Sequence, residues 1–354
     1  MTQVYKNTLD LECLSEPTVS VIMANYCGAK YIERAVRSVL AQTIENIEII
    51  VVDDASTDNS LEILRGIAAE DQRVEIVAVE TNAGPGASRN LALSKVKGKW
   101  VAIVDSDDVI HPERFEILLD WAGKLDTDAI ADDLVFFPAN GSELNTTLLE
   151  MLDVKEPLEV TAEYFLESDT DGSSQPPLGY LKPVFKRKLV ADLRYPDLFI
   201  GEDYEFLLNF LLDKGFMHIV PEALYFYRRH TDSISFRLSE STVTGMIEYQ
   251  KSVLDSRLNL PDNLKRLMEL RISCLQKKLQ FEQLITGIKS RCFSDVAVLL
   301  FKQPKLLFPL SRSLLATTKR RLKSRSQWVP DAEDNFALFA KSSATAAPKK
   351  PVAL

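Results

Sequence analysis

The chain has 354 residues, 46% of them hydrophobic and 26% charged, and a formal net charge of −9. This composition is typical of a folded globular protein and excludes a chain that is disordered through most of its length. Because domains typically span ~100–200 residues, the length predicts one complete α/β domain and a further extension of about a hundred residues.

No basic region followed by an apolar core stands at the N-terminus, and no uncharged apolar run reaches the ~18 residues that cross a bilayer. The four cysteines form neither a CxxC pair nor a Cys/His zinc pattern, which favours a reduced setting. We therefore expect a cytoplasmic protein.

Basic residues gather in one segment. Residues 296–330 carry eight Lys or Arg and no Asp or Glu, so the rest of the chain is strongly acidic. Nucleic acid is a poor partner for such a body. The part from 302 to 325 also contains apolar clusters. It predicts either a peripheral contact with the inner face of the cytoplasmic membrane, or with membrane biosynthetic proteins, or an ordinary helical packing surface.

Residues 18–137 alternate between strand and helix patterns. Strands are predicted for runs rich in β-branched residues, VSVIMAN, IEIIVVD, VEIVAVE and WVAIVD. Helices are predicted between them, for YIERAVRSVLAQ, NSLEILRGIAAE and GASRNLALSKV. This progression with short connections predicts a mostly parallel sheet with helices on both faces and a ligand site at the carboxyl ends of the strands.

The pattern weakens after Phe137, and residues 138–177 are polar and acidic. Within them, the Gly, Ser and Pro residues of SDTDGSSQPP indicate a mobile loop near the acceptor side or a simple surface connection. A strand-like segment, a helix and a pair of strands follow, in LKPVFKRKLV, GEDYEFLLNFLLDKG and FMHIVPEALYFYRRH. Residues 239–325 have a helical pattern broken at Pro261. The predicted division is an N-terminal extension, an α/β domain with a nucleotide half and an acceptor half, a helical and partly basic extension, and a disordered tail: 1–17, 18–238 (halves about 18–110 and 111–238), 239–330 and 331–354.

Three carboxylates crowd the end of the fourth strand, in VDSDDVIHPERF. Asp105, Asp107 and Asp108 follow an apolar run directly. Neighbouring carboxylates repel one another unless a cation lies between them. Such a cluster commonly binds a divalent cation that carries a diphosphate. The alternative is a solvated turn, with Asp108 or His111 as the cap of a helix that starts at Pro112.

The ends of the first two strands and the loop after the third predict nucleotide contacts. Asp53 or Asp54 can accept a hydrogen bond from a base imide or a ribose hydroxyl, and Tyr26 can stack on a base while Asn25 and Ala24 offer backbone contacts. In NAGPGASRN, Arg89 and free backbone N–H groups can face phosphate. A structural tyrosine and a simple tight turn are the alternatives.

The glycines follow the third strand, whereas a dinucleotide-binding domain has GxGxxG after the first, so hydride transfer is disfavoured. A sugar-phosphate nucleotidyltransferase would also have its glycine-rich loop after the first strand, so this interpretation is disfavoured too, but it stays an alternative.

Further carboxylates open a helix at GEDYEF. Glu202 and Asp203 either complement the helix dipole or supply a general base for a sugar hydroxyl, and the spacing leaves open which of them faces a cleft. In YRRHTDSIS, His230 is either structural or a metal ligand.

Taken together, the ordered motifs VSVIMANY, EIIVVDDASTD, NAGPGASRN, VDSDD, GEDYEF and YRRHTDSIS resemble the family-2 glycosyltransferases of GT-A fold from about Val19 to Ser235. Within this family the pattern is most similar to exopolysaccharide enzymes of the succinoglycan type. Cys27 departs from the Asn usual in the family, and the QxxRW motif of processive members is absent.

The resemblance implies a set of residue roles. Ala24, Tyr26 and Asp54 hold the uracil of a UDP-sugar, and Arg89 lies near the nucleotide. The DxD motif of Asp105, Ser106 and Asp107 meets the ribose and a divalent metal, Mn²⁺ or Mg²⁺. Asp203 is the base, and His230 joins the metal and diphosphate.

The implied reaction is an inverting, single transfer of a hexose, expected to be glucose, from a UDP-sugar to a lipid-linked oligosaccharide acceptor. The product is a β-glycoside in exopolysaccharide biosynthesis. An inactive binding protein on the same fold is the non-enzymatic alternative.

Overall fold

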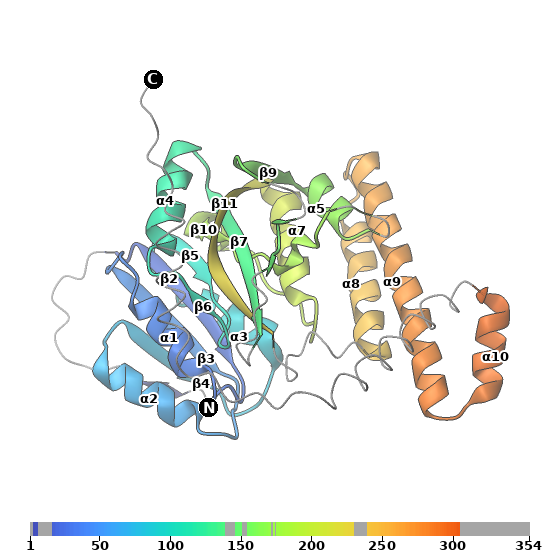
Figure 1. Cartoon of the computed structure of the whole chain (residues 1–354), viewed down its shortest axis with the longest axis horizontal. Helices are drawn as coiled ribbons and strands as arrows, with labels where there is room; N and C mark the ends of the chain where they lie inside the picture. Colours follow the sequence, from blue (N-terminus) through green and yellow to red (C-terminus); the bar gives the residue numbers. More distant parts are fainter. Residues whose placement is uncertain are drawn as a thin grey trace.

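The computed structural model describes residues 3–5, 16–138, 146–150, 154–170, 173, 175–229 and 239–304. One mixed sheet with helices packed against it forms the centre of the molecule (Figure 1). The strand order along its main path is β1-β4-β3-β2-β5-β10-β7-β11-β6. The strands are β1 Gln3–Tyr5, β2 Val19–Asn25, β3 Ile47–Asp53, β4 Val74–Ala78, β5 Trp100–Ile103, β6 Val109–Ile110, β7 Ala129–Pro138, β8 Thr146–Thr147, β9 Leu158–Thr161, β10 Val184–Lys186 and β11 Phe216–Arg229.

The described helices connect these strands and then form a helical group of their own. They are α1 Ile32–Leu40, α2 Ser60–Glu70, α3 Gly84–Leu93, α4 Arg114–Lys124, α5 Ala162–Ser168, the short 3-10 helix η2 Leu178–Tyr180, α6 Arg187–Val190, α7 Glu202–Lys214, α8 Glu240–Ser256, α9 Asp262–Lys289 and α10 Phe293–Lys302.

The first part of the sheet is parallel, as predicted. β4, β3, β2 and β5 lie side by side in this order and run in the same direction. Their β-branched residues are buried almost throughout β2 and β3, as expected for strands that are covered on both faces. The carboxyl ends of β2, β3 and β5 therefore meet at one edge of the sheet.

In the second part of the sheet, β10 lies antiparallel between β5 and β7, and β11 runs parallel to β7. The expected pair of strands in residues 216–230 was wrong, because β11 is a single strand with register shifts between Ile219 and Tyr225. Pro221 lies within this irregular stretch, and proline has no N–H to donate to a neighbouring strand.

The segment 138–177 contains more regular structure than its polar sequence indicates. β9 pairs with β11, and α5 follows it directly. The hydroxyl of Thr161 accepts a hydrogen bond from the Tyr164 N–H and so caps α5, while Phe165 and Leu166 are buried. α5 ends at Ser168, the first residue of the loop predicted for SDTDGSSQPP.

The C-terminal described residues are helical, as predicted, and α9 begins directly after Pro261. Figure 1 shows α8 and α9 side by side beyond α5 and α7, with α10 farthest from the sheet. None of the described helices is long and apolar enough to cross a membrane. The basic segment from residue 305 on and the predicted tail 331–354 lie outside the described residues.

Candidate active site

A cleft of about 880 Å³ opens at the carboxyl ends of β2, β3 and β5. It brings together eight of the nine residues that the sequence predicts for the site, although they come from distant parts of the chain. They are Ala24, Tyr26, Asp54, Arg89, Asp105, Ser106, Asp107 and Asp203. The ninth, His230, lies outside the described residues.

Asp54 fixes one wall of the cleft. Its carboxylate is buried and accepts hydrogen bonds from the N–H groups of Ala83 and Gly84, at 2.9 and 2.8 Å. Gly84 has φ +87°, a conformation that favours glycine, and it starts α3. Asp54 therefore anchors the loop that leads into α3, and its contact with a base stays a prediction. Tyr26 lies at the same side and is 51% exposed.

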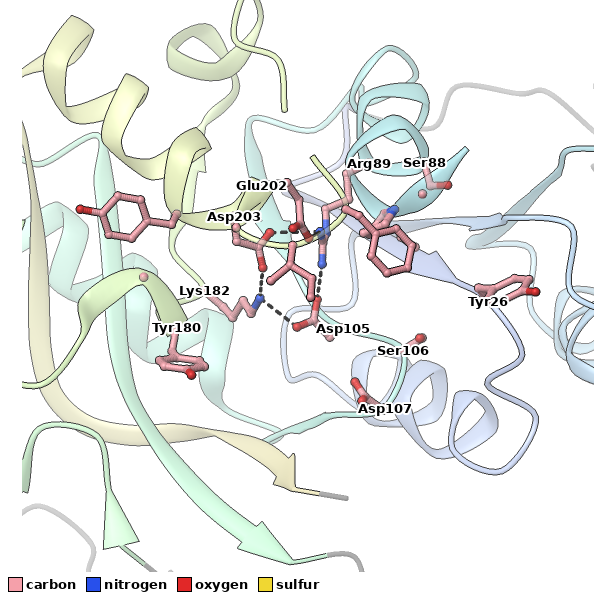
Figure 2. A pocket seen from close by; sticks show the side chains of 18 of the residues that line it. Tyr26, Ser88, Arg89, Asp105, Ser106, Asp107, Tyr180, Lys182, Glu202 and Asp203 are labelled. Atoms are coloured by element: carbon pink, nitrogen blue, oxygen red, sulfur yellow. Dashed lines mark hydrogen bonds and ion pairs between the residues drawn. The ribbon is translucent and has the colours of Figure 1, made fainter. Parts of the chain in front are cut away.

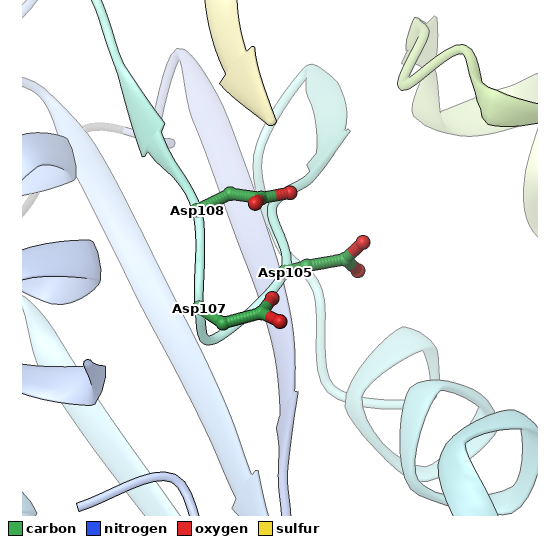
Figure 3. A group of neighbouring side chains, drawn as sticks. All are labelled: Asp105, Asp107 and Asp108. Carbon is green, nitrogen blue, oxygen red and sulfur yellow. The ribbon is translucent and has the colours of Figure 1, made fainter. Parts of the chain in front are cut away.

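The carboxylates after β5 converge, as Figure 3 shows. Oxygens of Asp105, Asp107 and Asp108 lie within 4.8 Å of one another. Asp108 is buried and accepts hydrogen bonds from the Tyr225 hydroxyl, at 2.8 Å, and from the N–H of Arg228, at 2.7 Å. Burial, followed by the charges of Asp107 and Asp105, raises the pKa of Asp108 well above its usual range. Asp108 is thus held by β11 and is not the helix cap considered from sequence.

Two buried cations connect the two sides of the cleft (Figure 2). Arg89 of α3 donates to Asp105 and Glu202, both at 2.8 Å, and its guanidinium lies 3.1 Å from Asp203. Lys182 lies 2.8 Å from Asp105 and 2.6 Å from Asp203. We call these five side chains the charge cluster.

The charge cluster shifts the proton affinities of its members. Burial opposes ionisation of Asp105, but Lys182 and Arg89 outweigh it and hold the pKa of this carboxyl well below its usual range. Burial, followed by the neighbouring charge of Asp203, raises the pKa of Glu202 to about 7. The two adjacent carboxylates thus have different surroundings.

The sequence spacing left open whether Glu202 or Asp203, at the start of α7, faces the cleft. Both carboxylates line the cleft, but the Glu202 side chain is 10% exposed and that of Asp203 is 24% exposed. Gly201 stands before them at φ +91°, in the left-handed region. Asp203 is therefore the more accessible of the two from the cleft.

Lys182 is the member of the charge cluster that sequence reasoning missed. Its segment LGYLKPVF carries no motif, and the only signal is one basic residue in an apolar run. The backbone is fixed by Arg114, which donates to the carbonyl of Lys182 at 2.7 Å and is itself paired with buried Asp132.

The expected contact of Arg89 with a nucleotide stays a prediction. In the structure its guanidinium is occupied by carboxylates and lies 5.4 Å from the centroid of the Tyr195 ring. Asn90, the next residue of α3, exchanges two hydrogen bonds with the backbone of Tyr195. α3 is thereby fixed against the segment that leads to α7.

Comparison with known proteins gives the family. Residues 20–186 match the family described as Glycosyl transferase family 2. The putative teichuronic acid biosynthesis glycosyltransferase TuaG of Bacillus subtilis (strain 168) is 30% identical over 221 residues, which cover 62% of this chain and 82% of TuaG. The chain belongs to glycosyltransferase family 2. The resemblance stated from sequence is thus confirmed.

Other family members match over more of the chain. The succinoglycan biosynthesis protein ExoO of Rhizobium meliloti (strain 1021) is 29% identical over 307 residues, covering 86% of this chain and 87% of ExoO. The expected similarity to succinoglycan-type enzymes is therefore also found.

Solved structures confirm the GT-A fold. S. aureus TarS 1–349 in complex with UDP-GlcNAc superposes with a TM-score of 0.57 at 23% identity, covering 71% of this chain and 70% of TarS. The mannosyltransferase PcManGT of Pyrobaculum calidifontis, in complex with GDP-Man and Mn²⁺, has a TM-score of 0.50 at 17% identity, covering 88% and 89%.

Proposed function

We propose that this family 2 member transfers a hexose, expected to be glucose, from a UDP-sugar to a lipid-linked saccharide acceptor in exopolysaccharide assembly, with inversion at the anomeric carbon. The observation that carries the proposal is the charge cluster, in which Arg89 and Lys182 hold Asp105 next to Asp203. One cleft thus contains carboxylates suited to the divalent cation of a nucleotide diphosphate and a separate accessible carboxylate suited to accept a proton from a hydroxyl. The similarity to ExoO, named for succinoglycan biosynthesis, and to TarS, solved with UDP-GlcNAc, supports the choice of donor and pathway class.

The residues after β5 fit a divalent metal ion. Carboxylate oxygens are the ligands that Mg²⁺ and Mn²⁺ prefer, and the three aspartates bring theirs close together. As the family resemblance implies, Asp107 together with Asp105 would hold the ion, while Asp108 is bound by Tyr225 and Arg228 of β11. A bound Mg²⁺ or Mn²⁺ would stabilise negative charge on the leaving diphosphate. The role of His230 as a further ligand stays a prediction.

Asp203 is the proposed general base. The acceptor hydroxyl attacks the anomeric carbon as the bond from this carbon to the diphosphate breaks, and UDP leaves with the electron pair. The hydroxyl proton passes to Asp203, which Lys182 and Arg89 hold in place. Attack from the face opposite the leaving group inverts the configuration, so an α-linked donor gives a β-glycoside.

Substitution of the base tests this function. Asp203→Asn should lower kcat for transfer from UDP-glucose by a factor on the order of 10²–10⁴, the usual effect of removing a general base, while UDP still binds. Asp213→Asn, at the other end of α7, is the matched control and should transfer at the wild-type rate. A rate for Asp203→Asn equal to that of the control would remove Asp203 from this role.

The same assay identifies the reaction and the metal. UDP as the released product supports sugar transfer, whereas pyrophosphate would indicate nucleotidyl transfer. Asp107→Ala should lose the part of the UDP affinity that depends on Mn²⁺. Identical titrations of wild type and Asp107→Ala, with and without Mn²⁺, would contradict the proposed metal site.

Membrane attachment through residues 302–325 belongs to the proposal but rests on sequence, because all of this segment after residue 304 lies outside the described residues. Flotation with anionic liposomes over a series of salt concentrations tests it, and absence of binding at low salt would reject it.

A further inference from the structure

The loop that carries the three aspartates lies against β11 on the side that faces away from the cleft. Residues 104–108 connect β5 to the short strand β6, which pairs with Tyr225 and Phe226 of β11. Tyr225 is fully buried and Arg228 is 6% exposed, and neither residue lines the cleft. Their contacts with the loop are therefore made on its buried side.

Tyr225 contacts two of the three aspartates through its hydroxyl. This hydroxyl accepts a hydrogen bond from the Asp105 N–H, at 3.0 Å, and donates one to the carboxylate of Asp108, at 2.8 Å. The guanidinium carbon of Arg114, which is fully buried, lies 5.0 Å from the centroid of the Tyr225 ring. One hydroxyl on a buried and packed ring thus joins the first and the last aspartate of the loop.

Arg228 contacts the remaining aspartate. Its Nε donates a hydrogen bond to the carbonyl oxygen of Asp107, at 2.6 Å, and its backbone N–H donates one to the carboxylate of Asp108, at 2.7 Å. The guanidinium carbon lies 4.7 Å from the centroid of the Tyr31 ring and 4.6 Å from that of the Phe137 ring. A guanidinium that is stacked on two rings has little freedom to move.

None of these four hydrogen bonds uses the carboxylate of Asp105 or Asp107. Both of these residues line the cleft, whereas Asp108 is buried and does not line it. Carboxylates as close as these repel one another when no cation is present. The loop therefore needs other contacts to keep them together, and a buried network of satisfied hydrogen bonds supplies such contacts.

We propose that Tyr225 and Arg228, which we call the β11 pair, are positioning residues that keep Asp105 and Asp107 arranged for the divalent cation of the donor diphosphate. The pair acts through the backbone of both ligands and through Asp108. Removal of a hydrogen-bonding partner behind a metal ligand typically lowers metal affinity by about 10–100-fold. The inference rests on the proposed function, because it assigns how the metal site of that reaction is maintained.

Binding of Mn²⁺ to the UDP-loaded protein, followed by electron paramagnetic resonance, tests the β11 pair. Tyr225→Phe keeps the ring but removes the hydroxyl, and Arg228→Lys keeps the charge but removes the Nε donor. Each variant should raise the Mn²⁺ dissociation constant by on the order of tenfold, with no such change in the UDP dissociation constant measured without metal.

Tyr249→Phe is the matched control. The Tyr249 hydroxyl also accepts a hydrogen bond, from the Asn209 side chain at 2.8 Å, but Tyr249 belongs to α8 and does not line the cleft. Its Mn²⁺ dissociation constant should equal the wild-type value. The same weakening in Tyr249→Phe as in Tyr225→Phe would mean that loss of any buried hydroxyl contact has this effect, and would overturn the proposal.

Hydrogen exchange gives a second readout that needs neither metal nor nucleotide. In Tyr225→Phe the Asp105 N–H loses its acceptor, so this amide should exchange faster than in wild type and in Tyr249→Phe. An unchanged exchange rate at Asp105 would show that the hydroxyl does not hold the loop, and would overturn the role of Tyr225.

The binding data also separate this proposal from the proposed function. A wild-type Mn²⁺ affinity in Tyr225→Phe and Arg228→Lys overturns the β11 pair even if the protein transfers sugar, and so does a wild type that binds no Mn²⁺. Mn²⁺ binding that depends on both residues, in a protein that turns over no UDP-sugar, supports the β11 pair and counts against the transferase reaction.

Discussion

At the scale of single residues, Arg89 and Lys182 each lie between carboxylates that are far apart in the sequence. The motif positions of Asp105 and Asp203 could be predicted because each follows a recognisable strand or opens a helix. Lys182 could not, because its partners are brought to it only by tertiary folding. Such a buried cation cannot lose its charge without leaving carboxylates uncompensated.

Substitution of Lys182 should therefore be costly. Lys182→Met leaves Asp105 and Asp203 with Arg89 alone, and we expect the free energy of unfolding to fall by about 3 kcal/mol. Lys182→Arg keeps the charge and should recover part of the loss. Lys124→Met is the control, since Lys124 and its partner Asp120 are both more than half exposed and such pairs contribute about 0–1 kcal/mol. Urea unfolding of the three variants measures these free energies. Equal losses for Lys182→Met and Lys124→Met would contradict the structural role of Lys182.

The raised pKa of Glu202 has a consequence for stability. The pKa is about 7 in the folded protein against 4.5 as the ordinary value, so between these values the folded state binds more protons than the unfolded state. The stabilisation from a protonated Glu202 is complete below pH 4.5 and is lost as the pH rises through 7. The free energy of unfolding of wild type should fall over this window by about 1 kcal/mol per pH unit relative to Glu202→Gln. Parallel pH profiles of the two proteins, from urea unfolding, would disprove this.

At the scale of elements, the parallel strands β2 to β5 and their helices were predictable because local apolar patterns specify them. α5 was not, because it has only seven residues and depends on packing of Phe165 and Leu166 in the core. The continuous β11 was also missed, because Pro221 normally indicates an interruption and only pairing with β7 carries the strand past it.

Substitution by alanine should have opposite effects on stability at two helical glycines, Gly86 and Gly66. In α3, a Cβ at Gly86 would lie 2.8 Å from the carbonyl oxygen of Pro196, so Gly86→Ala must move α3, which carries Arg89, away from the segment before α7. We expect a loss of about 1–3 kcal/mol in the free energy of unfolding and reduced transfer. In α2, nothing lies within 4 Å of a Cβ at Gly66, so Gly66→Ala should stabilise by about 0.5–1 kcal/mol. Thermal unfolding of both variants shows whether each substitution stabilises or destabilises the protein. A stabilised Gly86→Ala would contradict the expected clash with Pro196.

At the scale of the whole molecule, the sequence indicated the helices after residue 238 but not that they contribute to the cleft. Arg271 of α9 is 4% exposed, lies 3.1 Å from Glu205 of α7 and 3.2 Å from Asp169, and stacks 3.6 Å from the centroid of the Tyr204 ring. Such contacts between distant segments leave no local pattern, so the sequence alone predicts these helices as a separate extension.

Substitution of two arginines, Arg271 and Arg257, measures how strongly α8 and α9 are attached to α7. Arg271→Met removes the partner of the buried Glu205 and should lower the free energy of unfolding by about 3–5 kcal/mol. Arg257→Met is the matched control, because Arg257 also pairs with α7, through Asp213, but in a half-exposed position, and should cost no more than about 1 kcal/mol. Similar unfolding midpoints in urea for both variants would mean that the helices are attached by apolar packing alone.

The charge cluster also bears on how the protein is made. Its members are spread from residue 89 to residue 203, and the helices that support the opposite wall follow still later. A nascent polypeptide leaving the ribosome presents Arg89 and Lys182 before their last counter-ions have been synthesised. Premature termination before residue 203 would therefore yield a product that lacks part of the charge cluster.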